Sequence, residues 1–295
     1  MAPCVCHQPM TYSIRNLILA EVQTALDWAA AEGWNPGLHD AACFYVADPT
    51  GFFGGFLDDQ LIATLAAIKY GQTFGFIGLY LVKPGYRGQN YGMALWRAGM
   101  AALQGRTVGL DGVPAQQANY ARSGFVLAHN NIRFAGQAAG PMVAAVDAGI
   151  LPLSSLPAGL VWAYDRPFFP DDRRQFVQHW ISQPGTVALG VLRPGGLTGG
   201  LAGYGVLRPC QVGYKIGPLL ADDPEVAERI FSALVGQVPA GAAVFMDVPA
   251  LNLAALALAK KQGMGPVFET ARMYTGVAPT LPLHRLFGIT TFELG

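Results

Sequence analysis

The sequence contains few charged residues and has no excess of either sign. Of its 295 residues, 13% are charged, against roughly 25% in an average soluble domain, and 19 Lys and Arg balance 19 Asp and Glu. A chain without net positive charge or a run of basic residues lacks the attraction on which nucleic-acid binding depends. We therefore expect no nucleic-acid partner. Disorder is excluded because 52% of the residues are hydrophobic and 11% are aromatic.

Long apolar runs and targeting signals are also missing. A membrane-spanning helix needs about 20 consecutive apolar residues, and proline and glycine interrupt the two most apolar stretches, 148–164 and 230–246. The N-terminus shows no basic segment followed by an apolar one, as a signal peptide would. The sequence thus predicts a cytoplasmic protein without a membrane partner.

Cysteine is scarce, and four cysteines are too few for a disulfide framework in a chain of this length. Cys43 and Cys210 lie among apolar residues, which is typical of small core side chains. Cys4, Cys6 and His7 could bind a metal, but no second ligand pair follows at zinc spacing. We expect no metal and interpret residues 1–11 as a terminal tail.

One order of helices and strands occurs twice along the chain. Apolar spacing predicts a helix over 19–31, a strand pair, a third strand over 74–82, a helix from 91, a strand, a short helix and a closing strand. The second half repeats this order, with a helix over 171–182 and a last strand over 267–274. We therefore expect two copies of one α/β (α+β) fold. The expected boundaries are a first domain over 12–135, a linker over 136–160 and a second domain over 161–295.

A glycine-containing loop, Val82–Gly92, joins the third strand to the following helix and has the sequence VKPGYRGQNYG. Such a turn directs backbone N–H groups outward, and the helix dipole adds positive charge, so phosphate groups bind there. The spacing fits neither the P-loop nor the dinucleotide-binding pattern. The loop is a candidate phosphate site outside both classes.

The segment resembles the acyl-CoA pyrophosphate loop of the GNAT acyltransferase superfamily, R/Q-x-x-G-x-G/A after a V-x-P-x-x-R run. Arg87 and Gly92 match this pattern, and Tyr120–Phe125 fits the family's downstream Y-x-x-x-G-F. Asn90 stands where the family usually has glycine, but asparagine tolerates left-handed backbone conformations. The resemblance covers residues 12–135, and the second half resembles the additional domain of tandem members.

The resemblance implies two tandem GNAT-like domains, each a mixed, mostly antiparallel sheet flanked by helices. It implies N-acetyl transfer from acetyl-CoA to a primary amine of a small molecule or peptide, by direct attack in a monomer or homodimer. The strand over 78–82 would diverge from the strand over 107–113 and leave a slot for pantetheine. Tyr120 matches the general acid, with ordinary packing as the alternative. The expected CoA-binding residues are Leu81, Val82, Arg87, Gly88, Gln89, Asn90, Tyr91 and Gly92.

The general base is not identified by the resemblance, and a water chain is one alternative to a side chain. Asp111 ranks first because it lies in an apolar strand, where burial raises the pKa of a carboxyl group; a structural hydrogen bond is the other interpretation. Trp34, Asn35 and Asp40 follow the first helix, where this fold binds the acceptor, although they also suit a plain turn. The full set of base candidates is Glu21, Asp27, Glu32, Asp40, Asp111 and His129.

The second half lacks the residues of an acyl-CoA site. Its corresponding loop, Leu219–Glu225, has three acidic residues and no glycine, and Ala259 stands at the position of Tyr120. We expect a degenerate copy that packs on the first domain and lines its acceptor pocket. The alternative function is a non-catalytic CoA- or small-ligand-binding protein of the same fold, which Asn90 favours.

Overall fold

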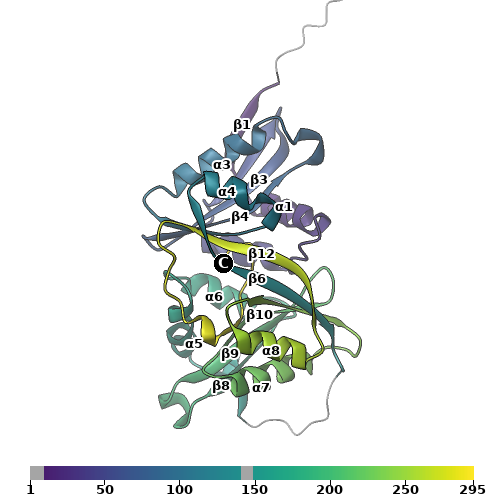
Figure 1. The fold of residues 1–295 in the computed structure, drawn as a ribbon, viewed down its shortest axis with the longest axis vertical. Helices are drawn as coiled ribbons and strands as arrows, with labels where there is room; N and C mark the ends of the chain where they lie inside the picture. Colours follow the sequence, from purple (N-terminus) through teal and green to yellow (C-terminus); the bar gives the residue numbers. More distant parts are fainter. Residues whose placement is uncertain (1–9, 141–148) are drawn as a thin grey trace, which may run out of the picture.

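The computed structural model describes residues 10–140 and 149–295, which form two halves stacked along the long axis (Figure 1). The candidate metal ligands Cys4, Cys6 and His7 lie outside these residues. The first half contains β1 (Tyr12–Asn16), α1 (Leu19–Ala31), α2 (Asp40–Ala47), β2 (Phe52–Leu57), β3 (Gln60–Tyr70), β4 (Phe74–Val82), α3 (Tyr91–Ala102), β5 (Thr107–Gly112), α4 (Gln117–Arg122) and β6 (Phe125–Gln137). The second contains β7 (Ile150–Pro152), α5 (Ala158–Asp165), α6 (Arg174–Trp180), β8 (Val187–Leu192), β9 (Leu201–Pro209), β10 (Tyr214–Ala221), α7 (Pro224–Val235), β11 (Ala243–Pro249), α8 (Leu253–Lys261), β12 (Gly265–Thr275) and β13 (Leu286–Gly288).

All strands of the described residues join one sheet, in the order β1-β2-β3-β4-β5-β12-β6-β11-β10-β9-β8-β7, with β13 paired to β10. Most neighbours are antiparallel, and helices cover the sheet, so the expected fold class is confirmed. In the described part of the chain, no helix has the length and hydropathy needed to cross a bilayer.

The two halves exchange strands at the middle of the sheet. β12, from the second half, lies between β5 and β6 and pairs antiparallel with both, and β6 pairs in turn with β11 (Figure 1). The last long strand of the second half therefore completes the sheet of the first. The sequence analysis placed a closing strand in each half, and it did not predict this exchange because strand pairing is non-local.

Several elements differ from the predicted boundaries. β6 continues to Gln137 and α5 begins at Ala158, so both enter the expected linker over 136–160. The helix expected over 171–182 begins only at Arg174, because the Asp171 carboxylate instead accepts backbone N–H bonds at Gln72 and Thr73. β1 and α2 were not predicted. α2 is apolar on most of its faces, so it shows little helical periodicity.

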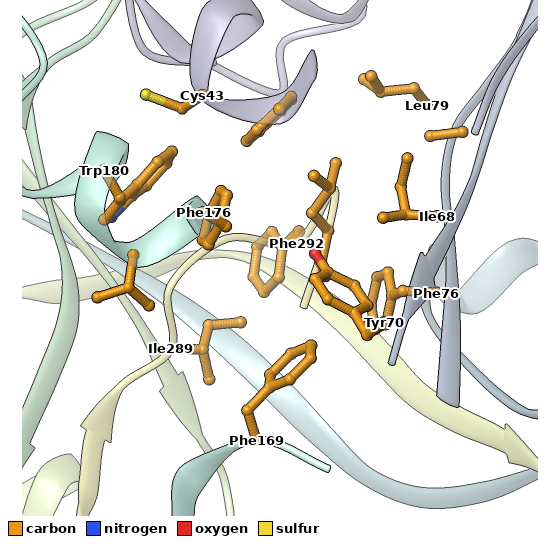
Figure 2. Close-up of a cluster of buried hydrophobic side chains, with 14 of the residues drawn as sticks. Cys43, Ile68, Tyr70, Phe76, Leu79, Phe169, Phe176, Trp180, Ile289 and Phe292 are labelled. Carbon is orange, nitrogen blue, oxygen red and sulfur yellow. The ribbon is translucent and has the colours of Figure 1, made fainter. Parts of the chain in front are cut away.

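A hydrophobic core joins the two halves (Figure 2). Phe44 of α2 stacks on Trp180 of α6 at 6.0 Å between ring centroids, and Phe169 lies edge-on to Tyr70 at 4.6 Å. The segment after β13 runs through this core, where Ile289 and Phe292 are buried. This continuous core fixes the second half against the first.

Candidate active site

A cleft opens where β4 and β5 separate. The two strands pair in parallel from Phe74–Thr107 to Ile77–Leu110, and the pairing ends there. The residues of β4 after Ile77 do not pair with β5. A cavity of about 810 Å³ fills the divergence. The resemblance implied this slot, and the geometry agrees with it.

A bulge in β4 shapes the wall of the cleft. The register with β3 shifts between Gly78–Ala66 and Leu81–Thr64, and Leu79 has a positive φ of 46°. The hydroxyl of Thr64 donates to the carbonyl oxygen of Leu79 at 2.9 Å and holds this backbone. A bulge re-aims the peptide groups beside it, so N–H groups of β4 become available to a ligand in the cleft.

The loop before α3 has the backbone that the sequence predicted. Asn90 adopts the left-handed conformation with φ 67°, and Gly88 has φ 77°. No side chain caps the N-terminus of α3, so its first N–H groups are free of a capping side chain and can bind an anion. A Cβ atom at Gly92 would lie 2.7 Å from Tyr80 Oη and 2.8 Å from Val82 Cγ2. Glycine at this position therefore lets the helix start approach the cleft wall.

Arg87 lies at the edge of the cleft and is half exposed. Its Nε donates to the Val82 carbonyl oxygen at 2.8 Å, and its Nη2 forms an ion pair of 2.5 Å with Glu32 at the end of α1. Of the expected CoA-binding residues, Leu81, Val82 and Arg87 line the cleft, whereas Gly88, Gln89, Asn90, Tyr91 and Gly92 form the adjoining loop and first turn of α3.

Tyr120 reaches the cleft from α4. Its ring packs on Trp96 at 5.7 Å between centroids, and a Cβ atom at Gly112 would lie 2.2 Å from the ring. Burial raises the pKa of the phenol to about 12, so the group holds its proton at neutral pH. Tyr120 can therefore donate a proton, as a general acid must.

Asp111 also lines the cleft, but in surroundings other than those expected. Arg272 of β12 binds both carboxylate oxygens, at 2.6 and 2.9 Å, and Asn131 donates to Oδ1 at 2.8 Å. The sequence analysis placed Asp111 in an apolar strand and did not identify Arg272 as its partner, because it did not place β12 beside β5. The carboxylate joins the two halves of the sheet.

The three expected acceptor residues are not brought together. Trp34 lines the cleft. Asn35 instead makes two hydrogen bonds to the backbone of Val212, and Asp40 is fully buried in an ion pair of 2.9 Å with Arg208. Neither lines the cleft, and Asp40 has no exposed surface for an acceptor. Both residues connect the first half to the second.

Among the remaining base candidates, only Glu32 lines the cleft. Burial, with the positive charge of Arg272 as a second cause, lowers the pKa of His129 to about 4. His129 is not among the residues lining the cleft, nor are Glu21 and Asp27. In residues 10–140 and 149–295, no three His, Cys, Asp or Glu side chains converge as metal ligands would.

Sequence reasoning missed the part of the cleft that the second half supplies. Phe268 and Thr270 of β12 line it, as do Phe292 and Glu293 from the segment after β13. No local pattern in the sequence marks these residues, since the strand exchange brings the first two to the first half and the path of the segment after β13 brings the other two. The general expectation that the second half lines the pocket agrees with this geometry.

Comparison with known proteins identifies the fold. The family model described as "Acetyltransferase (GNAT) family" matches residues 19–125, and the one described as "Acetyltransferase (GNAT) domain" matches residues 161–288. The holothin acyltransferase of Pseudoalteromonas sp. (strain SANK 73390) is 32% identical over 285 residues, which cover 97% of this chain and 95% of that protein. The chain belongs to the GNAT acyltransferase family.

Solved GNAT structures share the whole architecture. A putative acetyltransferase from Pyrococcus horikoshii superposes with a TM-score of 0.79 at 22% identity, covering 99% of this chain and 100% of that one. A tandem GNAT protein from the clavulanic acid biosynthesis pathway gives a TM-score of 0.62 at 17% identity, covering 92% and 100%. At these identities the likeness concerns the fold, and it confirms the tandem arrangement.

In the second half, the chain itself occupies the space between β10 and β11 that corresponds to the slot between β4 and β5. β10 and β11 pair in parallel only from Tyr214–Val244 to Ile216–Met246, as β4 and β5 do in the first half. β13 then pairs with β10 at Leu219 and Leu220, and Ile289 N–H donates to the Asp247 carbonyl oxygen of β11 at 2.8 Å. The backbone that would face a cofactor is thus bonded to the chain itself.

Two of the acidic residues in the corresponding loop of the second half, Asp222 and Asp223, have structural partners. The Asp223 carboxylate caps α7 by accepting from the Val226 N–H at 2.9 Å. Asp222 forms ion pairs with Arg193 at 2.7 Å and Arg285 at 2.5 Å. These contacts give both carboxylates structural roles in the second half.

Proposed function

We propose that this GNAT protein transfers the acetyl group of acetyl-CoA to a primary amine of a small molecule or peptide, in the first half only. The observation that carries the proposal is the slot between β4 and β5, which leads to the left-handed Asn90 and the uncapped start of α3. The pantetheine arm would occupy the slot, and the pyrophosphate would bind the loop N–H groups. A cavity of about 810 Å³ has the size of a ligand-binding cleft.

In the proposed reaction, backbone N–H groups of β4 near Leu81 bind the thioester carbonyl oxygen and stabilise the negative charge that develops on it. The neutral amine, held close to the carbonyl carbon, attacks directly. The new C–N bond forms, the nitrogen releases one proton to solvent, the C–S bond breaks, and Tyr120 gives its proton to the leaving thiolate and regains one from solvent. Arg87 would exchange its ion pair with Glu32 for contact with the pyrophosphate.

The acceptor would bind between the two halves. The aromatic rings of Trp34, Phe268 and Phe292 line this part of the cleft, so an amine with an apolar or aromatic body suits it. The curated relative is named for holothin, which makes holothin the first acceptor to test. The panel would add benzylamine, tryptamine and a short peptide with a free N-terminus.

Two measurements test the proposal. Calorimetry should detect binding of acetyl-CoA to the protein, and thiol-reactive dye should detect CoA release that depends on an added amine. Failure to bind acetyl-CoA would contradict the proposed function. Binding without thiol release for any amine of the panel would instead favour the non-catalytic CoA-binding alternative.

A further inference from the structure

The segment Ile289–Gly295 leaves the filled slot of the second half and enters the active cleft of the first. Figure 1 marks the end of the chain between the two halves. Tyr70 Oη donates to the Leu294 carbonyl oxygen at 3.1 Å, and the rings of Phe292 and Phe268 lie 6.1 Å apart. Figure 2 shows Phe292 within the core between the halves. These contacts fix the backbone on both sides of Glu293.

Glu293 lies against the point where β4 leaves β5. A Cβ atom at Gly78 would lie only 1.9 Å from the Glu293 carbonyl oxygen, so the two backbones touch. Gly78 directly precedes the bulged Leu79, beside the N–H groups expected to bind the thioester. Glu293 is also one of the residues that line the cleft. Its side chain is therefore close to the reacting centre of the proposed function.

The carboxylate of Glu293 has one satisfied and one unsatisfied oxygen. The residue is only 3% exposed. Its Oε2 accepts from the hydroxyl of Thr291, whereas its Oε1 has no hydrogen-bond partner among the described residues. A buried carboxylate oxygen without a donor costs free energy. A side chain held in this way suits a ligand that brings an N–H group.

Three buried cations lie near Glu293, and none of them donates a hydrogen bond to Oε1. Against the effect of burial, the carboxylates of Asp247 and Asp40 raise the pKa of Arg133 and Arg208, and Glu293 makes a smaller contribution in the same direction. Burial, followed by the charge of Arg133, lowers the pKa of Lys215. Arg133 is paired with Asp247 at 2.6 Å and Arg208 with Asp40 at 2.9 Å, while Lys215 Nζ donates to the Asn35 carbonyl oxygen at 2.9 Å. These groups thus have other partners, although Nη1 of Arg208 has no hydrogen-bond partner among the described residues.

We propose that Oε1 of Glu293 binds the amino group of the acceptor and takes its proton. This inference rests on the proposed function. The amine N–H donates to Oε1 while its nitrogen attacks the thioester carbonyl carbon. The C–N bond forms, the proton moves from nitrogen to Glu293, and the C–S bond breaks as Tyr120 protonates the thiolate. Solvent then removes the proton from Glu293 and restores that of Tyr120.

The inference defines the acceptor class more closely. The acceptor would be a primary amine whose nitrogen reaches Glu293 and whose apolar body contacts Phe292 and Trp34. Because Glu293 and Phe292 belong to the second half, that half would supply acceptor recognition while the first half binds CoA. The second half would therefore have a function in the enzyme although the chain itself fills the slot between β10 and β11.

Glu293→Gln tests the inference, because it keeps the shape of the side chain and removes its ability to accept a proton. We expect acetyl-CoA to bind with a Kd within about twofold of the wild type. With the panel amine that reacts fastest, kcat/KM for the amine should fall by about 100-fold, with an increased KM, as for loss of general base catalysis. Glu293→Asp, which keeps the carboxylate, should restore part of this loss. Glu269→Gln, on the exposed start of β12, is the matched control and should behave as wild type.

The possible failures are distinguishable. If Glu293→Gln binds acetyl-CoA and retains wild-type kinetics for the amine, Glu293 is not the group that takes the proton of the amine. The proposed function would still stand in that case. If the wild type does not bind acetyl-CoA, the proposed function fails and this inference fails with it. Should Glu293→Gln unfold more readily than the wild type, both variants are compared at a temperature where they are folded. An equal loss of amine kcat/KM in Glu293→Gln and Glu293→Asp would then overturn the inference, because the carboxylate would make no difference.

Discussion

Arg272 of β12 and Asp111 of β5 form a two-point ion pair with distances of 2.6 and 2.9 Å, although 161 positions separate them in the chain. The Asp111 side chain is fully buried and that of Arg272 is 8% exposed. The pair bridges the exchanged strand and the first half beside the cleft. It makes the C-terminal part of the chain necessary for the fold of the N-terminal part.

Arg272→Met should destabilise the protein by about 3–5 kcal/mol, because it leaves the buried Asp111 carboxylate without its cation. Urea unfolding would measure this loss. The matched control is Lys261→Met, which breaks the more exposed ion pair with Glu228 and should cost less than about 1 kcal/mol. Adding Asp111→Asn to Arg272→Met should recover stability. Equal effects of Arg272→Met and Lys261→Met would contradict a structural role for the buried pair.

Local sequence patterns were sufficient for elements whose apolar face is regular. The boundaries of α1 and β4 agree with the sequence analysis to the residue. The loop at Asn90 was also predicted, because its backbone depends on a few neighbouring residue types. These features are determined by the segment itself.

Features that depend on distant contacts were not predictable. β6 and β12 both show the pattern of a closing strand, and nothing within either shows which sheet it joins. This non-local pairing hid the partner of Asp111, and the path of the segment after β13 brings Glu293 to the cleft. Asp40 resembled a surface loop residue because Arg208, which neutralises it, lies 168 positions away.

Tyr120→Phe should lower kcat by about 100-fold if Tyr120 protonates the leaving thiolate, while the Kd for acetyl-CoA stays the same. Stopped-flow thiol release and calorimetry would separate these effects. The raised pKa of about 12 keeps the phenol protonated well above pH 10, so the wild-type kcat should not fall between pH 8 and 10. A loss of acetyl-CoA affinity with unchanged kcat would mean that Tyr120 only packs against the slot.

Glu32→Gln should strengthen CoA binding by a few-fold, because it removes the carboxylate that pairs with Arg87 in the free protein. Arg87→Glu should have the opposite effect and raise the Kd about tenfold, as expected for loss of a charge-assisted hydrogen bond. Calorimetry with CoA at low salt would measure both. Glu228→Gln and Arg174→Glu, at exposed ion pairs of the second half, are the charge-matched controls. Weaker CoA binding by Glu32→Gln would show that Glu32 itself contributes to the site.

Asn90→Gly should preserve or improve CoA binding, because glycine adopts a φ of 67° without strain. Asn90→Val should raise the Kd for CoA up to about tenfold, since a left-handed conformation costs an L-residue about 1–2 kcal/mol. Gly88→Ala, at φ 77°, should weaken binding for the same reason. Gly85→Ala is the control, because Gly85 lies in open space and its φ is not positive. If Asn90→Gly binds CoA more weakly than the wild type, the asparagine side chain itself contributes to CoA binding. Asparagine at the position where the family usually has glycine would then have a function of its own.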